Sequence, residues 1–366
     1  MVSRLLFATL LLLSLFISRS AIAEEPVLHV YNWSDYIADE VLEQFQTETG
    51  IKVIYDVYDS NEVLEAKLLA GHSGYDVIFP TARPFALRHI KAGIYQPLDK
   101  SKLANYGNLD PVIMQSLDEV DPGNAHIVPY MWGTTSIGYN RAKVLERLGA
   151  DVPLDSWSLI FDPANAEKLS DCGISLLDDP TEVFSAALVY LGKDPNSTAP
   201  ADLEAATALL QKVRPYIRYF HSSQYINDLA NGDLCVAHGY SGDILQARDR
   251  ADEAANGVEV VLTIPREGAV LAIDVMAIPA DAPHPDNAHK LIDFLMRPDV
   301  IARITNYVAY ANAIPASMPL LEPDVRNDQG IFPPKEVMQS LVSPAELGPA
   351  DQRTRTRAWT RVKAGR

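Results

Sequence analysis

The fold is decided by residues 27–57, VLHVYNWSDYIADEVLEQFQTETGIKVIYDV. A strand-like run comes first, a run with apolar side chains at helical spacing follows, and a second strand-like run rich in β-branched and aromatic residues closes the stretch: Val27 to Asn32, Ile37 to Thr49 and Ile51 to Val57. The same order continues with Asn61 to Ala70 and Tyr75 to Phe79. This βαβαβ order predicts an α/β fold with a mostly parallel sheet covered by helices.

The first 23 residues form a separate segment. Arg4 supplies a positive charge, Leu5 to Ile17 an apolar stretch, and Ala21-Ile22-Ala23 a cleavage signal of small residues. The apolar stretch is too short to span a bilayer comfortably, and no later segment has about 18 uninterrupted apolar residues. The pattern therefore predicts a signal peptide over residues 1–23 and an exported, soluble mature protein without direct membrane insertion.

The mature chain is strongly acidic. Removal of the signal peptide takes Arg4 and Arg19 with it, so the 31 basic residues become 29 against 48 acidic ones and the net charge changes from −17 to −19. Nucleic acid and anionic lipid are poor partners for such a chain, whereas cations are attracted to it. Plain solubility explains the same composition, so charge alone does not assign a function.

The two cysteines, Cys172 and Cys235, suggest a covalent link. An even pair in an exported chain is more often a disulfide than a metal site, and a bridge between them would mainly restrict the unfolded chain. The histidines offer no competing metal motif, because His284 and His289 flank a loop-like stretch with proline and the others are scattered. We expect no metal and no cofactor.

The length of the mature chain, about 343 residues, favours two domains over a single core. Two extended runs, Ser136 to Asn140 and Val258 to Ile264, bracket a segment with α/β character of its own. A domain inserted into another, with the two crossings near these runs as a hinge, explains this layout. The expected lobes are residues 24–135 plus about 259–310 for lobe 1, and about 136–258 plus 311–366 for lobe 2.

Residues 31–36, YNWSDY, lie where the first strand is expected to end. In open α/β sheets, ligands bind in the crevice beyond the carboxyl ends of the strands. Trp33 and Tyr36 can present ring faces there. Ser34 offers a hydroxyl, and Asp35 a carboxylate that the positive end of the following helix would keep ionised. Such a set suits an ammonium group, although Ser34 or Asp35 could equally be only the helix cap and Trp33 only core.

Similar residues follow other strand-like runs. Thr81 comes after the run Tyr75 to Phe79, and Ser241-Gly242-Asp243 comes after a run that ends at Tyr240. In the apolar sequence LAIDVM the carboxylate of Asp274 stands alone, where an ionised acid is costly unless a cation meets it. The partner of Asp274 is either a cationic ligand or a structural arginine.

Enzymatic signatures are missing from the sequence. There is no G-x-S-x-G elbow, no P-loop, no H-E-x-x-H and no dinucleotide-binding glycine fingerprint. Paired carboxylates such as Asp178 with Asp179, or Asp35 with Asp39, could serve a glycosidase, but nothing in their spacing selects that chemistry. We therefore expect a binding protein and not an enzyme, with a carbohydrate-active hydrolase as the alternative.

The chain closely resembles the periplasmic polyamine-binding proteins of ABC transporters, the putrescine-binding member most of all. The resemblance covers essentially the whole mature chain and rests on long runs: YNWSDYIA at 31–38, YDVYDSNEVLEAKLLAG at 55–71, QPLDKSKL at 96–103, YLGKDPNST at 190–198, IRYFHSSQYINDLANGDLCVA at 217–237 and RTRAWTRVK at 355–363. It implies a type II-like periplasmic-binding-protein fold whose two lobes close by a hinge. It also implies a periplasmic monomer that passes a linear polyamine to an inner-membrane ABC permease.

Matched position by position, the resemblance also implies a ligand site. The aromatic walls would be Trp33, Tyr36, Tyr240 and Tyr310. The groups that bind the amines would be Ser34, Asp35, Thr81, Glu182, Asp243 and Asp274, with Glu182 placed to act through water. Asp35 and Asp274 are expected to matter most, and Cys172 and Cys235 fall where the family has a disulfide.

Three positions depart from the resemblance and bear on specificity. Ala272 replaces a large aromatic side chain, so one cation–π face, about 0.5 to 2 kcal/mol where desolvated, is missing and the pocket is wider there. Asp179 stands where the spermidine-binding relative has an acid that meets an outer amine. Arg83 would place a positive charge at the same opening of the pocket as Asp179. There it would repel a third amine or pair with Asp179. Putrescine and spermidine both remain candidate ligands, and the alternative is a binder or sensor of another cationic amine such as agmatine or cadaverine.

Overall fold

The computed structural model describes residues 24–365, so the predicted signal peptide lies outside the described residues. Among the residues that the structure describes, no helix combines the length and the apolar character needed to cross a bilayer. The elements up to the first long strand are β1 (Val27–Trp33), α2 (Asp39–Thr49), β2 (Lys52–Tyr58), α3 (Asn61–Leu69), β3 (Val77–Ile78), a π-helical turn (Ala82–Ala86), α4 (Leu87–Lys91), short turns at Lys100–Lys102 and Tyr106–Asn108, α5 (Pro111–Leu117) and β4 (Ile127–Asn140).

Strands and helices continue to alternate after β4. The next elements are α6 (Arg141–Leu148), α7 (Ser158–Phe161), α8 (Pro163–Leu169), β5 (Ile174–Leu176), α9 (Pro180–Tyr190), α10 (Pro200–Val213), β6 (Ile217–Phe220), α11 (Tyr225–Ala230), β7 (Val236–Tyr240), α12 (Ser241–Ala254), β8 (Val260–Thr263) and β9 (Ala269–Ala277). The chain ends with α13 (Pro285–Leu295), α14 (Pro298–Val308), β10 (Ala311–Asn312), a turn at Pro315–Leu320, α15 (Pro323–Asn327), α16 (Lys335–Met338), β11 (Leu341–Val342) and α17 (Pro349–Lys363).

Within residues 24–365 the strands form one mixed sheet in the order β2-β1-β3-β9-β4-β7-β5-β6, with β8, β10 and β11 at its sides. At one end β1 runs parallel to β2 and β3, and at the other end β5 runs parallel to β6 and β7. The central strands β4 and β9 pair antiparallel from Ile127–Ala277 to Thr135–Val270. The predicted α/β class and the βαβαβ start are confirmed.

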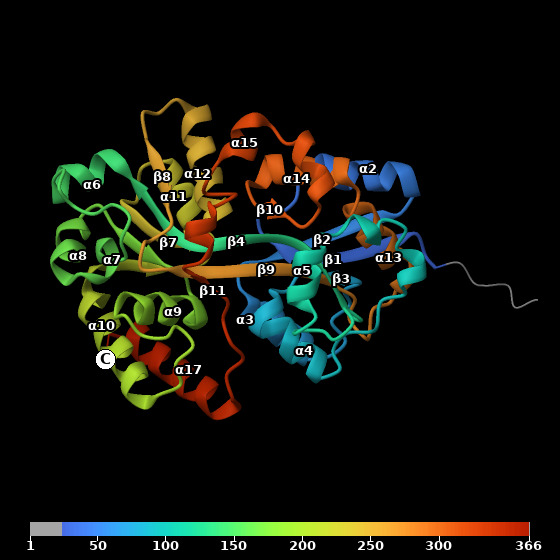
Figure 1. Ribbon diagram of the computed structural model, residues 1–366, viewed down its shortest axis with the longest axis horizontal. Helices are drawn as coiled ribbons and strands as arrows, with labels where there is room; N and C mark the ends of the chain where they lie inside the picture. The colour runs from blue at the N-terminus through green and yellow to red at the C-terminus, as the bar shows by residue number, and fades with distance from the viewer. Residues whose placement is uncertain (1–23, 366) are drawn as a thin grey trace, which may run out of the picture.

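In the described part of the chain, the buried apolar side chains gather mainly in two cores. The first includes Phe45, Phe79 and Tyr130, and the second includes Trp157 and Phe184. Figure 1 shows the corresponding halves: β1, β2 and β3 with α2, α13 and α14 on one side, and β7 with α6 to α10 on the other. The strands β4 and β9 run through the middle and connect the two halves.

The two crossings between the cores can be compared with the two extended runs identified in the sequence. Ser136 to Asn140 is the end of β4, as expected for the first crossing. The run Val258 to Ile264 contains β8, which pairs with the end of β4 and buries Val260 in the second core. The chain returns to the first core through β9, where Val275 is buried. We therefore place the second crossing in β9, and the lobe bounds given above stay a prediction.

Cys172 and Cys235 form the predicted disulfide inside the second core. Their Cα atoms lie 5.4 Å apart and their sequence separation is 63. Cys172 precedes β5 and Cys235 precedes β7, which is the parallel neighbour of β5. The bridge therefore ties together the starts of two adjacent strands that are distant in the sequence.

Replacing both cysteines by serine is expected to lower the free energy of unfolding by about 4 kcal/mol, because the open loop gives the unfolded chain more conformations. Urea unfolding of the oxidised protein and the double variant measures this difference. Ligand affinity is expected to stay unchanged, since neither cysteine lines the pocket described below. A loss below about 1 kcal/mol would show that the entropic model fails here.

Candidate functional site

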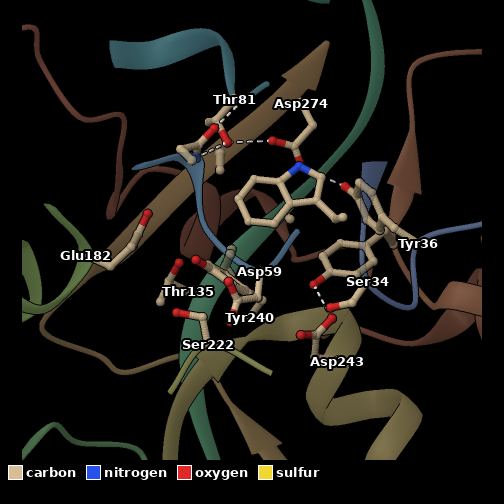
Figure 2. A pocket seen from close by; sticks show the side chains of 16 residues that line it. Ser34, Tyr36, Asp59, Thr81, Thr135, Glu182, Ser222, Tyr240, Asp243 and Asp274 are labelled. Atoms are coloured by element: carbon tan, nitrogen blue, oxygen red, sulfur yellow. Dashed lines mark hydrogen bonds between the residues drawn. The ribbon is translucent and has the colours of Figure 1, made fainter. Parts of the chain in front are cut away.

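A pocket lies between the two cores, at the ends of several strands (Figure 2). The first half and the tail that follows α14 contribute Trp33, Ser34, Tyr36, Asp59, Asn61, Thr81 and Tyr310. The second half contributes Glu182, Ser222, Tyr240 and Asp243. The crossing strands contribute Gly133, Thr134, Thr135, Ala272 and Asp274. Among the described residues that line the pocket there is no lysine and no arginine.

Two hydroxyl groups of the first half hold the carboxylate of Asp274. Tyr36 Oη donates to Oδ2 at 2.7 Å, and Thr81 Oγ1 donates to Oδ1 at 2.6 Å. Asn61 Nδ2 donates in turn to Thr81 Oγ1 at 2.9 Å, which fixes the hydroxyl. Burial raises the pKa of Asp274 to about 6, against the effect of the hydrogen bonds from Thr81 and Tyr36. No arginine meets Asp274 in the described chain, so the structural-arginine alternative has no support there.

The carboxylate of Asp243 is held by two phenols. Tyr225 Oη donates to Oδ2 at 2.8 Å and Tyr310 Oη donates to Oδ1 at 2.9 Å. The ring of Tyr310 packs directly on the backbone of Gly242, where an added Cβ would lie 2.1 Å from Cε2 of the ring. Burial raises the pKa of Asp243 to about 7. Asp243 is thus a second fixed acid in the same pocket, set apart from Asp274.

Glu182 is the third acid and lacks such partners. It lies in the first turn of α9, its residue is 7% exposed, and its Oε2 has no hydrogen-bond partner among the described residues. Burial, followed by the charge of Asp179, raises the pKa of Glu182 to about 8. A buried carboxylate without a partner is destabilising, so its position in the pocket points to a cation that comes from outside the chain.

Aromatic rings form the walls between these acids. The rings of Trp33 and Tyr240 meet edge to face with centroids 5.8 Å apart, and those of Tyr36 and Tyr310 do so at 4.8 Å. Trp33 Nε1 donates to the carbonyl of Phe79 at 2.8 Å, so its indole is buried in the first core and also lines the pocket. Ring faces suit both methylene groups and ammonium groups.

Asp35 lies outside the pocket lining, in contrast to its neighbours Ser34 and Tyr36. Its carboxylate is exposed and accepts a hydrogen bond from Arg250 Nη2 at 2.6 Å. The alternative that Ser34 or Asp35 only caps the next helix is wrong: α2 begins at Asp39 and its N-cap is Ala38. The carboxylate of Asp35 already pairs with Arg250, so a role for Asp35 at the ligand stays a prediction.

Two of the three specificity positions, Asp179 and Arg83, also lie outside the pocket lining. Asp179 is the N-cap of α9, and its Oδ1 accepts hydrogen bonds from the backbone amides of Thr181 and Glu182 at 2.7 and 3.1 Å. Burial raises the pKa of Asp179 to about 6. Arg83 Nη2 pairs with Glu119 at 2.8 Å, so the structure does not contain the predicted pair of Arg83 with Asp179. Ala272, the third of these positions, lines the pocket.

Sequence reasoning missed several lining residues: Asp59, Asn61, Gly133, Thr134, Thr135 and Ser222. Asp59 and Asn61 follow β2 directly, so the rule for strand ends would have found them had it been applied to the run Ile51 to Val57. Thr134 and Thr135 carry no comparable signal. They lie in the middle of β4, and they reach the pocket only because β4 crosses between the two halves.

These features define a class of protein. Two α/β halves with separate cores are joined by two crossing strands, and a buried pocket rich in acids and aromatic rings lies between them. That arrangement is typical of the two-lobed solute-binding proteins. The chain belongs to the family of bacterial extracellular solute-binding proteins, whose sequence profile matches residues 40–333.

Known proteins similar to the chain narrow this class. It is 55% identical over 344 residues to the putrescine-binding periplasmic protein SpuD of Pseudomonas aeruginosa, which covers 94% of each chain. It is also 55% identical over 345 residues to the putrescine-binding periplasmic protein PotF of Escherichia coli, which covers 94% of this chain and 93% of that one. A solved structure of a putative spermidine/putrescine ABC transporter from Listeria monocytogenes superimposes with a TM-score of 0.83 at 31% identity, covering 93% of this chain and 100% of that chain. The predicted resemblance and the two-lobed type II fold are confirmed.

Proposed function

We propose that the chain is a periplasmic solute-binding protein that captures a linear polyamine between its halves and delivers it to an inner-membrane ABC permease. The observation that carries the proposal is the pocket itself. Four carboxylates and several aromatic rings converge there, and the described lining contains no lysine or arginine to neutralise them. Its relatives are named for putrescine and spermidine, which supports the same class of solute.

The physical chemistry of capture follows from this geometry. Each ammonium group must lose its water, which costs several kcal/mol, and only well-placed carboxylates with further hydrogen bonds offset that loss. Asp274 and Asp243 are held in place by hydroxyl donors, so each is ready to receive one ammonium group. The rings cover the methylene chain and favour a narrow, linear solute. The fixed separation of the two acids then selects the spacing between amines.

Release and capture require the two halves to move apart and together. The strands β4 and β9 are the natural hinge, because they connect the two cores and contribute residues to the floor of the pocket. The halves already meet across the pocket, where Tyr310 of the first half donates to Asp243, so opening would move Glu182 and Asp243 away from the Tyr36 and Thr81 side. The closed form would be the one that the permease recognises.

Other cationic amines are a second candidate. Ala272 lines the pocket with only a methyl group, which leaves room beside Asp274 for a bulkier end such as the guanidinium of agmatine or for a longer diamine such as cadaverine. Two further relatives of the chain carry such ligands in their names, putrescine/agmatine at 45% identity and putrescine/cadaverine at 38% identity.

We infer that the chain acts by binding and not by turnover. The carboxylate pairs that would serve a glycosidase have other partners: Asp178 accepts hydrogen bonds from Trp359 Nε1 at 3.0 Å and Lys363 Nζ at 2.7 Å, Asp179 caps α9, and Asp35 pairs with Arg250. Release of sugar from model glycosides by the purified protein would contradict this inference.

Calorimetric titration of the refolded, ligand-stripped mature protein tests the proposed function. The ligands are putrescine, cadaverine, agmatine, spermidine and spermine, each at two salt concentrations. We expect one-to-one binding of at least one linear polyamine with only a modest loss of affinity at high salt, because buried charge pairs are screened little. Binding of none of the five would overturn the proposal.

A further inference from the structure

A second cavity of about 400 Å³ lies beside the pocket described above, and Ala272 lines both of them. We call it the side cavity. Thr81 lines the first pocket and its chain neighbour Ala82 lines the side cavity. In the same way, Asp274 lines the first pocket and Ile273 lines the side cavity. Because neighbouring Cα atoms are about 3.8 Å apart, the acid that is expected to anchor an ammonium group borders the side cavity directly. The volume of the side cavity is in the range of small-molecule sites.

The side cavity differs from the first pocket in its chemistry. Its lining is mostly apolar and comes from α5 and the loop after it, from β9 and from the tail after β11: Leu117, Val120, Leu271, Ile273, Pro344 and Ala345. Among the described residues that line it, only Arg83 and Glu119 are charged, and they pair with each other at 2.8 Å. An ammonium group would find no free acid there, whereas hydrocarbon would be buried favourably. The side cavity therefore suits an uncharged, apolar part of a ligand.

The strand β9 offers a free backbone donor where the two cavities meet. Its outer edge, opposite β4, has no strand partner in register over residues 271–273, between the pairing with β11 and the bridge from Asp274 to Thr81. Val275 N donates at 2.9 Å on this outer edge, to the carbonyl just before Thr81. Alternate residues of a strand direct their N–H groups to the same edge, so the N–H of Ile273 faces the gap. This N–H donates no hydrogen bond to another described residue, which leaves it available to a carbonyl oxygen of a ligand.

The outer wall of the side cavity is held by both halves of the molecule. Asn196 of the second half donates from Nδ2 to the carbonyl of Ser343 at 3.1 Å and accepts from Ala345 N at 2.7 Å. Glu346 pairs with Lys91 of the first half. Figure 1 shows this tail descending from β11 to α17. The tail is thus fixed on both sides, and the side cavity is bounded by ordered contacts.

We propose that the side cavity binds the acyl arm of an N-acylated polyamine whose free ammonium groups occupy the first pocket. This inference rests on the proposed polyamine function and adds a ligand class to it. In N1-acylspermidine the two charged nitrogen atoms are spaced as in putrescine, so they match Asp243 and Asp274, and the acylated arm continues beyond them. The acyl oxygen accepts from the N–H of Ile273, and the hydrocarbon lies against Leu117 and Leu271.

Calorimetric titration of the natural protein with N1-acetyl-, N1-butanoyl- and N1-hexanoylspermidine tests the proposal without any variant. The three ligands carry the same charge and differ only in the length of the acyl chain. Each methylene group that enters the side cavity is expected to raise affinity about threefold, so the hexanoyl ligand should bind at least tenfold more tightly than the acetyl ligand. Affinity that stays level or falls as the acyl chain lengthens would overturn the proposal.

A blocking variant then locates the acyl arm. Ala345→Trp fills the side cavity and keeps the backbone N–H that donates to Asn196, so the ratio of hexanoyl to acetyl affinity is expected to fall to about one. Ala350→Trp is the matched control, because Ala350 is exposed and lines neither cavity, and this variant should keep the ratio of the natural protein. An unchanged ratio in Ala345→Trp, or an equal fall in both variants, would overturn the side cavity as the site of the acyl arm. Failure of putrescine and spermidine to bind the natural protein would instead overturn the proposed function.

Discussion

The Asp274→Asn variant is expected to bind its polyamine about 30-fold to several thousand-fold more weakly than the natural protein, a loss of about 2 to 5 kcal/mol. Asparagine keeps the shape of the side chain but removes the charge that meets a desolvated ammonium group. Tyr36 Oη and Thr81 Oγ1 both need an acceptor at this side chain. Asparagine has only one acceptor oxygen, so its NH₂ group faces one of these two donors. The hydrogen-bond network and the charge pair are therefore lost together.

Calorimetry of Asp274→Asn beside Asp35→Asn measures this effect with an internal control. The carboxylate of Asp35 lies on Arg250 outside the pocket lining, so we expect its replacement to weaken binding less than about threefold, as for an exposed ion pair. Equal losses in the two variants would place Asp35 at the ligand, as the sequence predicts. If Asp274→Asn unfolds like the natural protein yet binds within threefold of it, Asp274 is not the principal anchor.

Much of the fold and part of the site could be predicted from local sequence. The βαβαβ start follows from the spacing of apolar residues, and the rule that ligands meet strand ends led to Trp33, Ser34 and Tyr36 after β1. The acid of Asp274 within an apolar strand predicts a partner in the same way. In each case the information lies within a few residues along the chain.

The rest depends on contacts between distant segments. Asp35 lies outside the pocket lining, has a left-handed backbone with φ of 54°, and pairs with Arg250, 215 residues later in the chain. Arg83 finds Glu119 and not Asp179 for the same kind of reason. Neither partner can be read from spacing, since hydrogen-bonding geometry between remote segments is set by the packed fold.

The position of the second crossing illustrates the same limit. Val258 to Ile264 and Ala269 to Ala277 are both extended runs, and local pattern does not distinguish a strand that stays in one core from one that passes to the other. The distinction comes from pairing: β8 pairs with the end of β4, whereas β9 pairs with β4 along most of its length. The floor of the pocket, with Thr135 and Ala272, follows from that pairing.

Polyamine affinity is expected to rise with pH from about 5.5 to about 8 and then level off. Burial raises the pKa of Asp243 to about 7 and that of Glu182 to about 8. A bound ammonium group favours the ionised carboxylate and lowers both values, so below the unbound pKa binding must release the proton. Each released proton raises affinity up to about tenfold per pH unit. The amine itself stays charged over this range, because its pKa lies near that of lysine, about 10.4.

Titrations at several pH values in two buffers with different ionisation enthalpies count the protons released. We expect release to be largest near pH 6, below the unbound pKa of both acids, where both are protonated before binding, and to vanish above about pH 9. Glu182→Gln should remove the part of the dependence that lies above pH 7 and leave the part that belongs to Asp243. Affinity that is constant from about pH 5.5 to 8.5, or net proton uptake, would mean that the bound amine does not meet Asp243 and Glu182 in their ionised form.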